Sequence, residues 1–291
     1  MSEISMLSYA NGKYVPTDAV SINVSNDMVG TFRGYRIFTA CRTLNGGKVF
    51  RMEDHVERLF RSAQELSMDL PHDREGLKDL VASVVEKNKD HGDVLLEIMY
   101  SGGKAAPASV APEGPAHVYV LVFPFTPPPM DWYVKGISLA SFAYQRQWPN
   151  VKLLNYVGGV VAHQTVVKNY GATEALFVSP RDYQTILEGT TFSLFVVDGN
   201  DNVITPPVNG TILDGITRKV ILELVWKAGI TAEERKITLA ELSNVNEVLL
   251  TSSTRNIVPV VKVDDTVIGD GVPGPMVKLL NKLLADYQRT Y

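Results

Sequence analysis

The sequence contains a single cysteine, Cys41, so an internal disulfide bond cannot form. One cysteine and five scattered histidines also argue against a zinc or iron–sulfur site, and we expect no metal. No apolar run reaches the roughly 18 to 20 residues that a transmembrane helix needs. The GxGxxG pattern of a dinucleotide-binding fold is absent. A net charge of −4 and the lack of any run rich in Lys and Arg argue against a nucleic-acid partner.

What is present is the composition of an ordinary globular protein. Hydrophobic residues make up 45% of the 291 residues and charged residues 21%, which is enough apolar material for a core. This length favours two domains. The opening Met1-Ser2-Glu3 lacks the basic and apolar regions of a secretory signal. Together with the lone cysteine, this predicts a cytoplasmic protein.

Strands and helices are mixed along the chain without strict βαβ spacing, which predicts an α+β fold rather than a doubly wound sheet. We expect strands near 94–100, 117–123, 136–143, 175–179, 193–198, 247–252 and 257–263, and helices near 157–170, 216–228 and 273–289. A proline-rich run at 123–129 is the best linker candidate, since proline continues neither a ladder nor a helix. We therefore predict a small domain at 1–125, a linker at 126–131 and a large domain at 132–291.

The first part of the chain predicts a hairpin followed by a helix. Residues 36–43 and 48–51 are expected strands on either side of the turn Asn45-Gly46-Gly47. Asp54 is expected to cap the next helix, with Glu57 completing a capping-box pattern, and Pro71 to stop it.

The segment Ile212–Arg218 predicts an anion site. A loop ends there at Gly215, and an amphipathic helix begins with Ile216 and Thr217 on its first turn. A helix start offers unpaired backbone N–H groups and the positive end of the helix dipole, which is where a phosphate group binds well. The Thr217 hydroxyl adds a donor. Many helices start after a glycine and bind nothing, so the interpretation needs support from elsewhere in the chain.

Three other segments supply that support. Lys152 is flanked by Val151, Leu153 and Leu154, and burial would make its amine a nucleophile toward carbonyls. Glu188 lies in a short turn between apolar strands, and residues 251–254 are four consecutive hydroxyl side chains. Taken singly, each is compatible with a solvent-facing side chain or a polar turn. Together, a phosphate site, a nucleophilic lysine and a carboxylate for a pyridine nitrogen are the parts that pyridoxal phosphate requires.

The chain resembles the class IV aminotransferases, a family of pyridoxal-phosphate enzymes with fold type IV. The resemblance runs from about residue 7 to 285. It rests on ordered motifs: Gly46-Gly47-Lys48-Val49-Phe50-Arg51, His55, Arg58-Leu59, Arg61-Ser62-Ala63, Val151-Lys152, Asn155-Tyr156, Gly171 to Ala175, Leu187-Glu188-Gly189, Thr205-Pro206-Pro207, Leu213 to Arg218, Asn246-Glu247-Val248, Leu250 to Thr254, Pro259-Val260 and Gly271 to Pro275.

The resemblance implies a role for each matched residue. Lys152 would bind the cofactor covalently and then move the substrate proton. Glu188 would pair with the pyridine nitrogen, and Tyr156 would bond the phenolic oxygen. The phosphate would be held by Arg51, Ile216, Thr217 and Ser253. His55 and Arg58 would support these residues rather than react.

The substrate side departs from the commoner family patterns. Residues 32–39 are expected to be a strand, and they carry Arg33 and Arg36 where many relatives have an acidic glycine-rich turn. Arg33-Gly34-Tyr35 resembles a less common group of D-amino-acid aminotransferases in which this arginine helps to hold the substrate carboxylate. Glu97 is instead reminiscent of (R)-amine transaminases. We name Arg33 and Arg36 as substrate-binding candidates, with Lys104 and Arg146 in reserve.

The sequence thus predicts a transaminase that exchanges an amino group between an amino acid and a 2-oxo acid by a ping-pong mechanism. The favoured donor is a D-amino acid such as D-alanine or D-glutamate. The alternatives are a branched-chain L-amino-acid transaminase, an (R)-amine transaminase or aminodeoxychorismate lyase on the same scaffold. A phosphate-ligand-binding protein without catalysis is a further alternative, which Lys152 and Glu188 argue against. The resemblance also implies a homodimer, with small amino and oxo acids as the only other partners.

Overall fold

The computed structural model describes residues 5–291 and separates into two compact units. Unit 1 comprises the described residues up to Thr126, together with Val151–Asn155 and Tyr291. Unit 2 comprises Pro127–Asn150 and Tyr156–Thr290. The change of unit after Thr126 falls in the predicted linker, but the return of 151–155 to unit 1 was not anticipated. Helices and strands are mixed in both units, so the α+β prediction is confirmed.

Unit 1 is built on a six-stranded antiparallel sheet in the order β2-β1-β6-β5-β3-β4. Its strands are β1 Leu7–Ala10, β2 Lys13–Pro16, β3 Arg36–Leu44, β4 Lys48–Val49, β5 Val94–Ser101 and β6 His117–Pro124. Its helices are α1 Met28–Arg33, α2 Met52–Glu65 and α3 Arg74–Lys87, with the 3₁₀ turns Thr17–Ala19, Val24–Asn26 and Lys89–His91.

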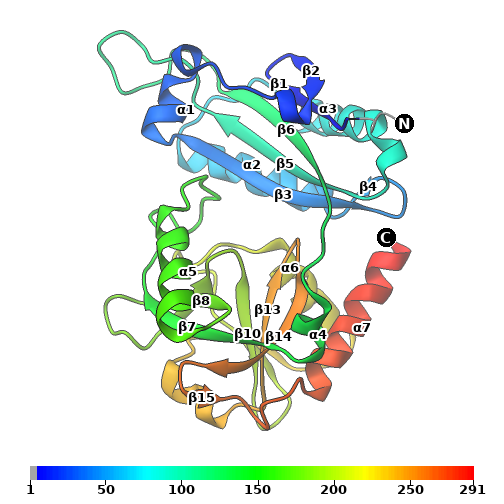
Figure 1. Ribbon diagram of the computed structural model, residues 1–291, viewed down its shortest axis with the longest axis vertical. Helices are drawn as coiled ribbons and strands as arrows, with labels where there is room; N and C mark the ends of the chain where they lie inside the picture. The colour runs from blue at the N-terminus through cyan, green and yellow to red at the C-terminus, as the bar shows by residue number, and fades with distance from the viewer. Residues whose placement is uncertain (1–4) are drawn as a thin grey trace. The chain divides into compact units, whose positions relative to one another are not determined.

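Side chains alternate across this sheet, and one face is the core of unit 1. Ile37 of β3 and Ile98 of β5 are fully buried on the face that α2 and α3 cover (Figure 1). Leu59 of α2 and Leu77 of α3 pack into the same cluster. The opposite face carries Phe38 and its partner Met99, together with the next pair on that face, Ala40 and Glu97. Burial of the first face therefore fixes which side chains β3 presents on the second.

Unit 2 contains a nine-stranded mixed sheet in the order β12-β11-β10-β13-β14-β7-β8-β9, with β15 beside β14. Its strands are β7 Ile137–Ala143, β8 Glu174–Val178, β9 Ile186–Gly189, β10 Ser193–Val197, β11 Val203–Thr205, β12 Ala232–Glu234, β13 Glu247–Ser252, β14 Asn256–Val263 and β15 Thr266–Val267. Its helices are α4 Met130–Val134, α5 Val157–Tyr170, α6 Ile216–Lys227 and α7 Pro275–Thr290, with a 3₁₀ turn at Leu239–Asn244.

The helices of unit 2 cover this sheet through small or branched side chains. Helix α5 packs on β7 and β8 through Ala162 and Val166, α6 packs on β13, and α7 packs on β14 (Figure 1). The continuous apolar runs of β8 and β10 are buried at every position, as a strand covered on both sides requires. The α5, α6 and α7 ranges confirm the expected helices to within two residues.

Two local predictions in unit 1 were wrong. Helix α2 begins at Met52, so Asp54 lies in its first turn rather than capping it, and the helix ends at Glu65, well before Pro71. The N-cap is Arg51, whose backbone is left-handed with φ 55°. The strand expected over 32–39 begins only at Arg36, because residues 32 and 33 end helix α1, and Gly34 closes this helix in the left-handed conformation that glycine adopts without strain.

Candidate active site

Lys152 is held against the edge of strand β3. Its carbonyl oxygen accepts the Phe38 N–H at 3.0 Å, and the Leu154 N–H donates to the Arg36 carbonyl oxygen at 3.0 Å. Leu153 pairs with Ile37 in this short antiparallel contact and packs against the unit 1 core. Because neighbouring side chains in such a segment point to opposite faces, Lys152 lies on the open face, with Nζ 4.6 Å from the centre of the Phe38 ring.

A buried polar cluster on α2 lies beside this lysine. Arg58 Nη2 donates to Thr39 Oγ1 at 2.8 Å, and Thr39 Oγ1 lies 2.6 Å from His55 Nδ1. His55 and Arg58 are 1% and 5% exposed. Burial lowers the pKa of His55 well below its usual value, and the charges of Arg58, Lys152 and Arg51 lower it further. His55 is therefore neutral at pH 7, and Arg58 is the strongest charge acting on it.

The same face of α2 reaches the backbone of Lys152. The Lys152 N–H donates to Ser62 Oγ at 3.3 Å, one helical turn beyond Arg58. Arg51, the predicted phosphate ligand, is the N-cap of the same helix. Its guanidinium binds the carboxylate of Asp54 through Nε, and its backbone N–H donates to the Tyr291 hydroxyl at 3.0 Å. Arg58 and Arg51 thus both lie, with Lys152, among the charges that surround His55.

Glu188 lies on β9 of unit 2 and is 6% exposed. Its Oε1 accepts Arg146 Nε at 2.7 Å, and its Oε2 accepts the Leu213 N–H at 3.1 Å. A buried carboxylate is stable only when charge or hydrogen bonds replace its lost water. Both oxygens are satisfied in this way, so Glu188 is a fixed, negatively charged acceptor rather than the solvated turn residue of the alternative interpretation.

A tight turn after Glu188 sets the geometry of this region. The Gly189 N–H donates to the Phe192 carbonyl oxygen at 2.8 Å. The Phe192 ring lies so close to Gly189 that any Cβ at this position would overlap it. Only glycine fits, and the turn leads directly from β9 into β10, which begins at Ser193.

The start of α6 meets the end of β13 near Ser193. A Cβ on Gly215, the N-cap of α6, would lie 2.6 Å from Ser193 Oγ, and Gly215 itself has no side chain with which to cap the first turn of the helix. Ser193 pairs with Thr251 in the β10–β13 ladder. Within residues 5–291, Thr251 Oγ1 and Ser252 Oγ are buried without a hydrogen-bond partner. Unused hydroxyl donors beside the start of a helix are features that bind an oxyanion.

The remaining cofactor candidates also belong to unit 2. Ile216 and Thr217 occupy the first turn of α6 and are 5% exposed. Ser253 follows the last residue of β13, and Tyr156 is the N-cap of α5, where the chain re-enters unit 2. Sequence reasoning missed Thr251 and Ser252. Their signal was the run of four hydroxyl residues, but strand register was needed to show which of them are buried.

The two substrate-binding candidates of the sequence have different environments. Arg36 is bound to the buried Asp27, with Nη2 2.6 Å from Oδ2, and its Nε donates to Ser101 Oγ at 2.8 Å. Arg33 ends α1, is exposed, and donates through Nη1 to the Val110 carbonyl oxygen at 3.0 Å. Arg36 thus lies in an internal ion pair, whereas Arg33 stands at the surface.

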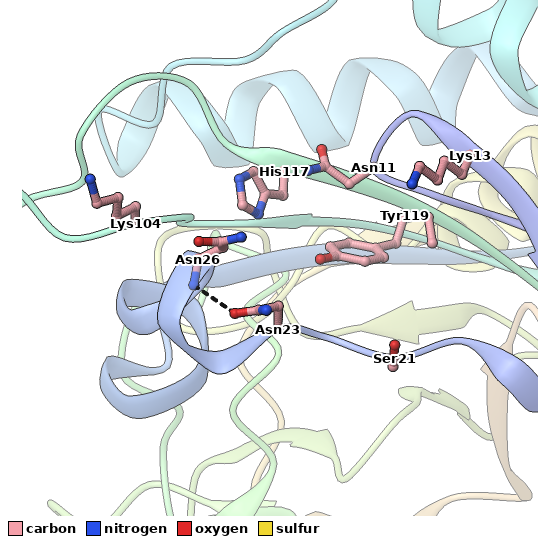
Figure 2. A pocket seen from close by; sticks show the side chains of 9 residues that line it. Asn11, Lys13, Ser21, Asn23, Asn26, Lys104, His117 and Tyr119 are labelled. Carbon is pink, nitrogen blue, oxygen red and sulfur yellow. Dashed lines mark hydrogen bonds between the residues drawn. The ribbon is translucent and has the colours of Figure 1, made fainter.

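Unit 1 also has a pocket of about 450 Å³ that is lined mainly by polar residues. Figure 2 shows His117 and Tyr119 of β6 facing Asn23 and Asn26, with Lys13 and Lys104 at the sides. Lys104, the reserve candidate for the substrate carboxylate, is 3.0 Å from Glu113 and thus ion-paired. Lys152, Arg51, Arg33 and Arg36 do not line this pocket, so it is distinct from the residues described above.

Comparison with known proteins decides the family. The family profile described as Amino-transferase class IV matches residues 36–263. The chain belongs to the class IV aminotransferases. The D-alanine aminotransferase of Bacillus licheniformis is 30% identical over 296 residues, which cover 96% of this chain and 98% of that protein. This aminotransferase therefore aligns with relatives along almost its whole length.

Solved structures agree on the fold. The branched-chain amino acid aminotransferase of Escherichia coli superposes with a TM-score of 0.88 at 23% identity, covering 97% of this chain and 94% of that one. The T.th. branched-chain amino acid aminotransferase with pyridoxamine 5'-phosphate gives a TM-score of 0.87 at 25% identity, covering 98% and 94%. The fold type IV prediction is confirmed, and the protein is a transaminase that depends on pyridoxal 5'-phosphate.

The residues of this chain fit that cofactor. Unit 2 offers a buried carboxylate for a ring nitrogen and unused hydroxyls beside a helix start for a phosphate. Among residues 5–291, no group of three or more His, Cys, Asp and Glu side chains is arranged to hold a metal ion. No helix in the same range is long and apolar enough to cross a membrane.

Proposed function

We propose that this aminotransferase uses a D-amino acid, such as D-alanine or D-glutamate, as amino donor and a 2-oxo acid as acceptor. The observation that carries the proposal is the contrast between the two candidate arginines. Arg36 is committed to the buried Asp27, while Arg33 is exposed at the end of α1. An arginine binds a carboxylate in a planar, two-bonded geometry, so Arg33 would select amino acids over simple amines.

Lys152 is the proposed catalytic residue. When bound, pyridoxal phosphate acts as the electron sink that makes the substrate Cα–H acidic. Lys152 Nζ would bind the cofactor carbonyl carbon covalently and then carry the proton from the substrate Cα. The contact of residues 152–154 with β3 supports this role, because it fixes the backbone from which the amine extends.

Glu188 and Tyr156 are proposed to contact the cofactor ring, and the phosphate would lie at the start of α6. There Ile216, Thr217, Ser252 and Ser253 would donate to its oxygens. For the cation we propose Arg58 over the sequence candidate Arg51. Arg58 lies on the α2 face that holds the Lys152 backbone, whereas the guanidinium of Arg51 binds Asp54.

We further propose a cytoplasmic homodimer. Helix α5 leaves an apolar stripe on its surface, with Val157, Val160 and Val161 between 50% and 71% exposed. A stripe of this kind favours contact with another protein surface, and a second copy of the chain is the simplest occupant. The single cysteine, Cys41, is buried, which is compatible with a reducing compartment.

The test is a panel of donors with 2-oxoglutarate: D-alanine, L-leucine and (R)-1-phenylethylamine. The proposal expects the highest kcat/KM for D-alanine. Preference for L-leucine or for the amine would replace it with the branched-chain or (R)-amine alternative, and release of an aromatic amine from aminodeoxychorismate would indicate the lyase. Borohydride reduction and peptide mass mapping should place the cofactor on Lys152, and a label on another lysine would contradict its role.

A further inference from the structure

Arg146 makes two separate contacts with one guanidinium. Its Nε donates to Glu188 Oε1 at 2.7 Å, and its Nη2 donates to the Pro149 carbonyl oxygen at 2.8 Å. The side chains of Arg146 and Glu188 are only 14% and 8% exposed. The planar group therefore connects the carboxylate on β9 to the loop that follows β7, inside unit 2.

This arrangement fixes the direction in which Glu188 points. A guanidinium is rigid and planar, so a bond at Nε and a bond at Nη2 together determine its orientation. The second carboxylate oxygen is held from another side by the Leu213 N–H at 3.1 Å. With one partner on each oxygen, the Glu188 carboxylate has little freedom to rotate, and the buried charge is balanced.

The bond from Arg146 to Pro149 lies just before the segment that contains Lys152. Pro149 lies three residues before Lys152, at the point where the chain is about to leave unit 2. The bond from Arg146 Nη2 to the Pro149 carbonyl oxygen restrains the unit 2 end of this loop.

We propose that Arg146 is a positioning residue that aims the Glu188 carboxylate at the ring nitrogen of the cofactor. This inference rests on the proposed role of Glu188. The inference also gives Arg146 a different role from the one considered in the sequence analysis, where it was a reserve candidate for the substrate carboxylate. A substrate carboxylate at Arg146 would have to compete with Glu188 and Pro149 for the guanidinium, so Arg146 acts on the cofactor side and not as the substrate anchor.

The test compares two ligands that differ only at the ring nitrogen. Apoprotein is titrated with pyridoxal phosphate and with its carbocyclic analogue, in which a C–H group replaces that nitrogen. The dissociation constant of the analogue, divided by that of pyridoxal phosphate, isolates the ring-nitrogen contact. Arg146→Gln should lower this ratio by about tenfold or more, the range expected for losing one aligned bond to a charged group. Affinity for the analogue should change much less.

Three variants make the result decisive. Glu188→Gln should lower the ratio in the same way, and Arg146→Lys, which keeps the charge but loses the two-bonded fork, should lower it partway. Arg235→Gln is the control, because Arg235 pairs with Glu241 at the same 2.7 Å on the exposed surface. It should leave the ratio unchanged.

Each outcome is informative. A fall with Glu188→Gln but an unchanged ratio in Arg146→Gln would overturn the positioning role while leaving the proposed function intact. An unchanged ratio with Glu188→Gln would instead remove the proposed role of Glu188. If Arg146→Gln does not fold, Arg146→Lys decides: a wild-type ratio there overturns the proposal, and a reduced ratio with a wild-type unfolding midpoint supports it.

Discussion

The choice between Arg58 and Arg51 as the phosphate cation leads to a quantitative prediction. Arg58 is 5% exposed and bonded to Thr39, so its guanidinium is already oriented before a phosphate arrives. A bond between such a group and an anion contributes about 1.5 to 3 kcal/mol. We expect Arg58→Gln to weaken cofactor binding by roughly ten- to a hundredfold, since about 1.4 kcal/mol corresponds to a factor of ten.

Arg51→Gln should have a smaller effect. The Arg51 and Asp54 side chains are 13% and 18% exposed, and they already form an ion pair at the start of α2. Arg51 would have to give up part of this ion pair to bind a phosphate, so we expect Arg51→Gln to change the affinity by no more than about fivefold, or about 1 kcal/mol. The two variants therefore differ in the size of the effect, although each removes one positive charge.

The assay measures dissociation constants of the apoprotein for pyridoxal phosphate and for pyridoxal, which lacks the phosphate. The dissociation constant for pyridoxal is divided by that for pyridoxal phosphate. This ratio depends on the phosphate contact alone, because a general loss of protein stability weakens the binding of both ligands and cancels. Arg58→Lys, which keeps the charge, should recover part of the lost affinity. If Arg51→Gln reduced the ratio and Arg58→Gln did not, the geometric argument would be wrong and the sequence assignment would stand.

Four further outcomes follow from the contacts described. Glu188→Gln should lower kcat by at least about a hundredfold, several kcal/mol of barrier, and near-normal turnover would argue against its role. The pKa of His55 is lowered in the folded state, so its contribution to stability is complete above about pH 6.5 and is lost as the pH falls toward the lowered value. Below pH 6.5 the free energy of unfolding measured with urea should therefore fall with pH by up to about 1.4 kcal/mol per pH unit, and His55→Gln should reduce this dependence; an unchanged dependence would contradict the reasoning. Gly189→Ala should destabilise the fold by about 1 to 3 kcal/mol in thermal unfolding because its Cβ would overlap the Phe192 ring, whereas Gly199→Ala, with open space around it, should be nearly neutral. Arg33→Ala should reduce kcat/KM for D-alanine far more than for (R)-1-phenylethylamine, and an equal loss for both would place the carboxylate anchor elsewhere.

The sequence predicted best where a pattern is local and repeated. Helix α5 and the strand β13 follow from apolar periodicity, and the α6 start follows from Gly215 before an amphipathic run. The family and its cofactor could also be predicted, because the motifs around Lys152 and Glu188 occur in the order typical of the family. Such signals need no knowledge of tertiary contacts.

The errors lie where tertiary contacts decide the structure. Residues 32 and 33, expected in a strand, belong to helix α1, whose first flanking residue Asp27 is held by Arg36 of β3 and Ser101 of β5. Spacing along the sequence placed Arg33 and Arg36 on one strand and gave no sign that Arg36 had a buried partner. Likewise, only the fold shows that the helix face of Arg58 reaches Lys152.

The return of residues 151–155 to unit 1 has a consequence for how the protein folds during its synthesis. A nascent chain that ends at Thr126 has strand β3 but not the segment that bonds to Arg36 and Phe38 at its edge, nor Leu153 in its core. That edge stays open to pairing with other chains until residue 155 has left the ribosome. Unit 1 therefore cannot be completed before synthesis of unit 2 has begun, and the two halves of the gene cannot be separated at the linker without leaving an unpaired strand.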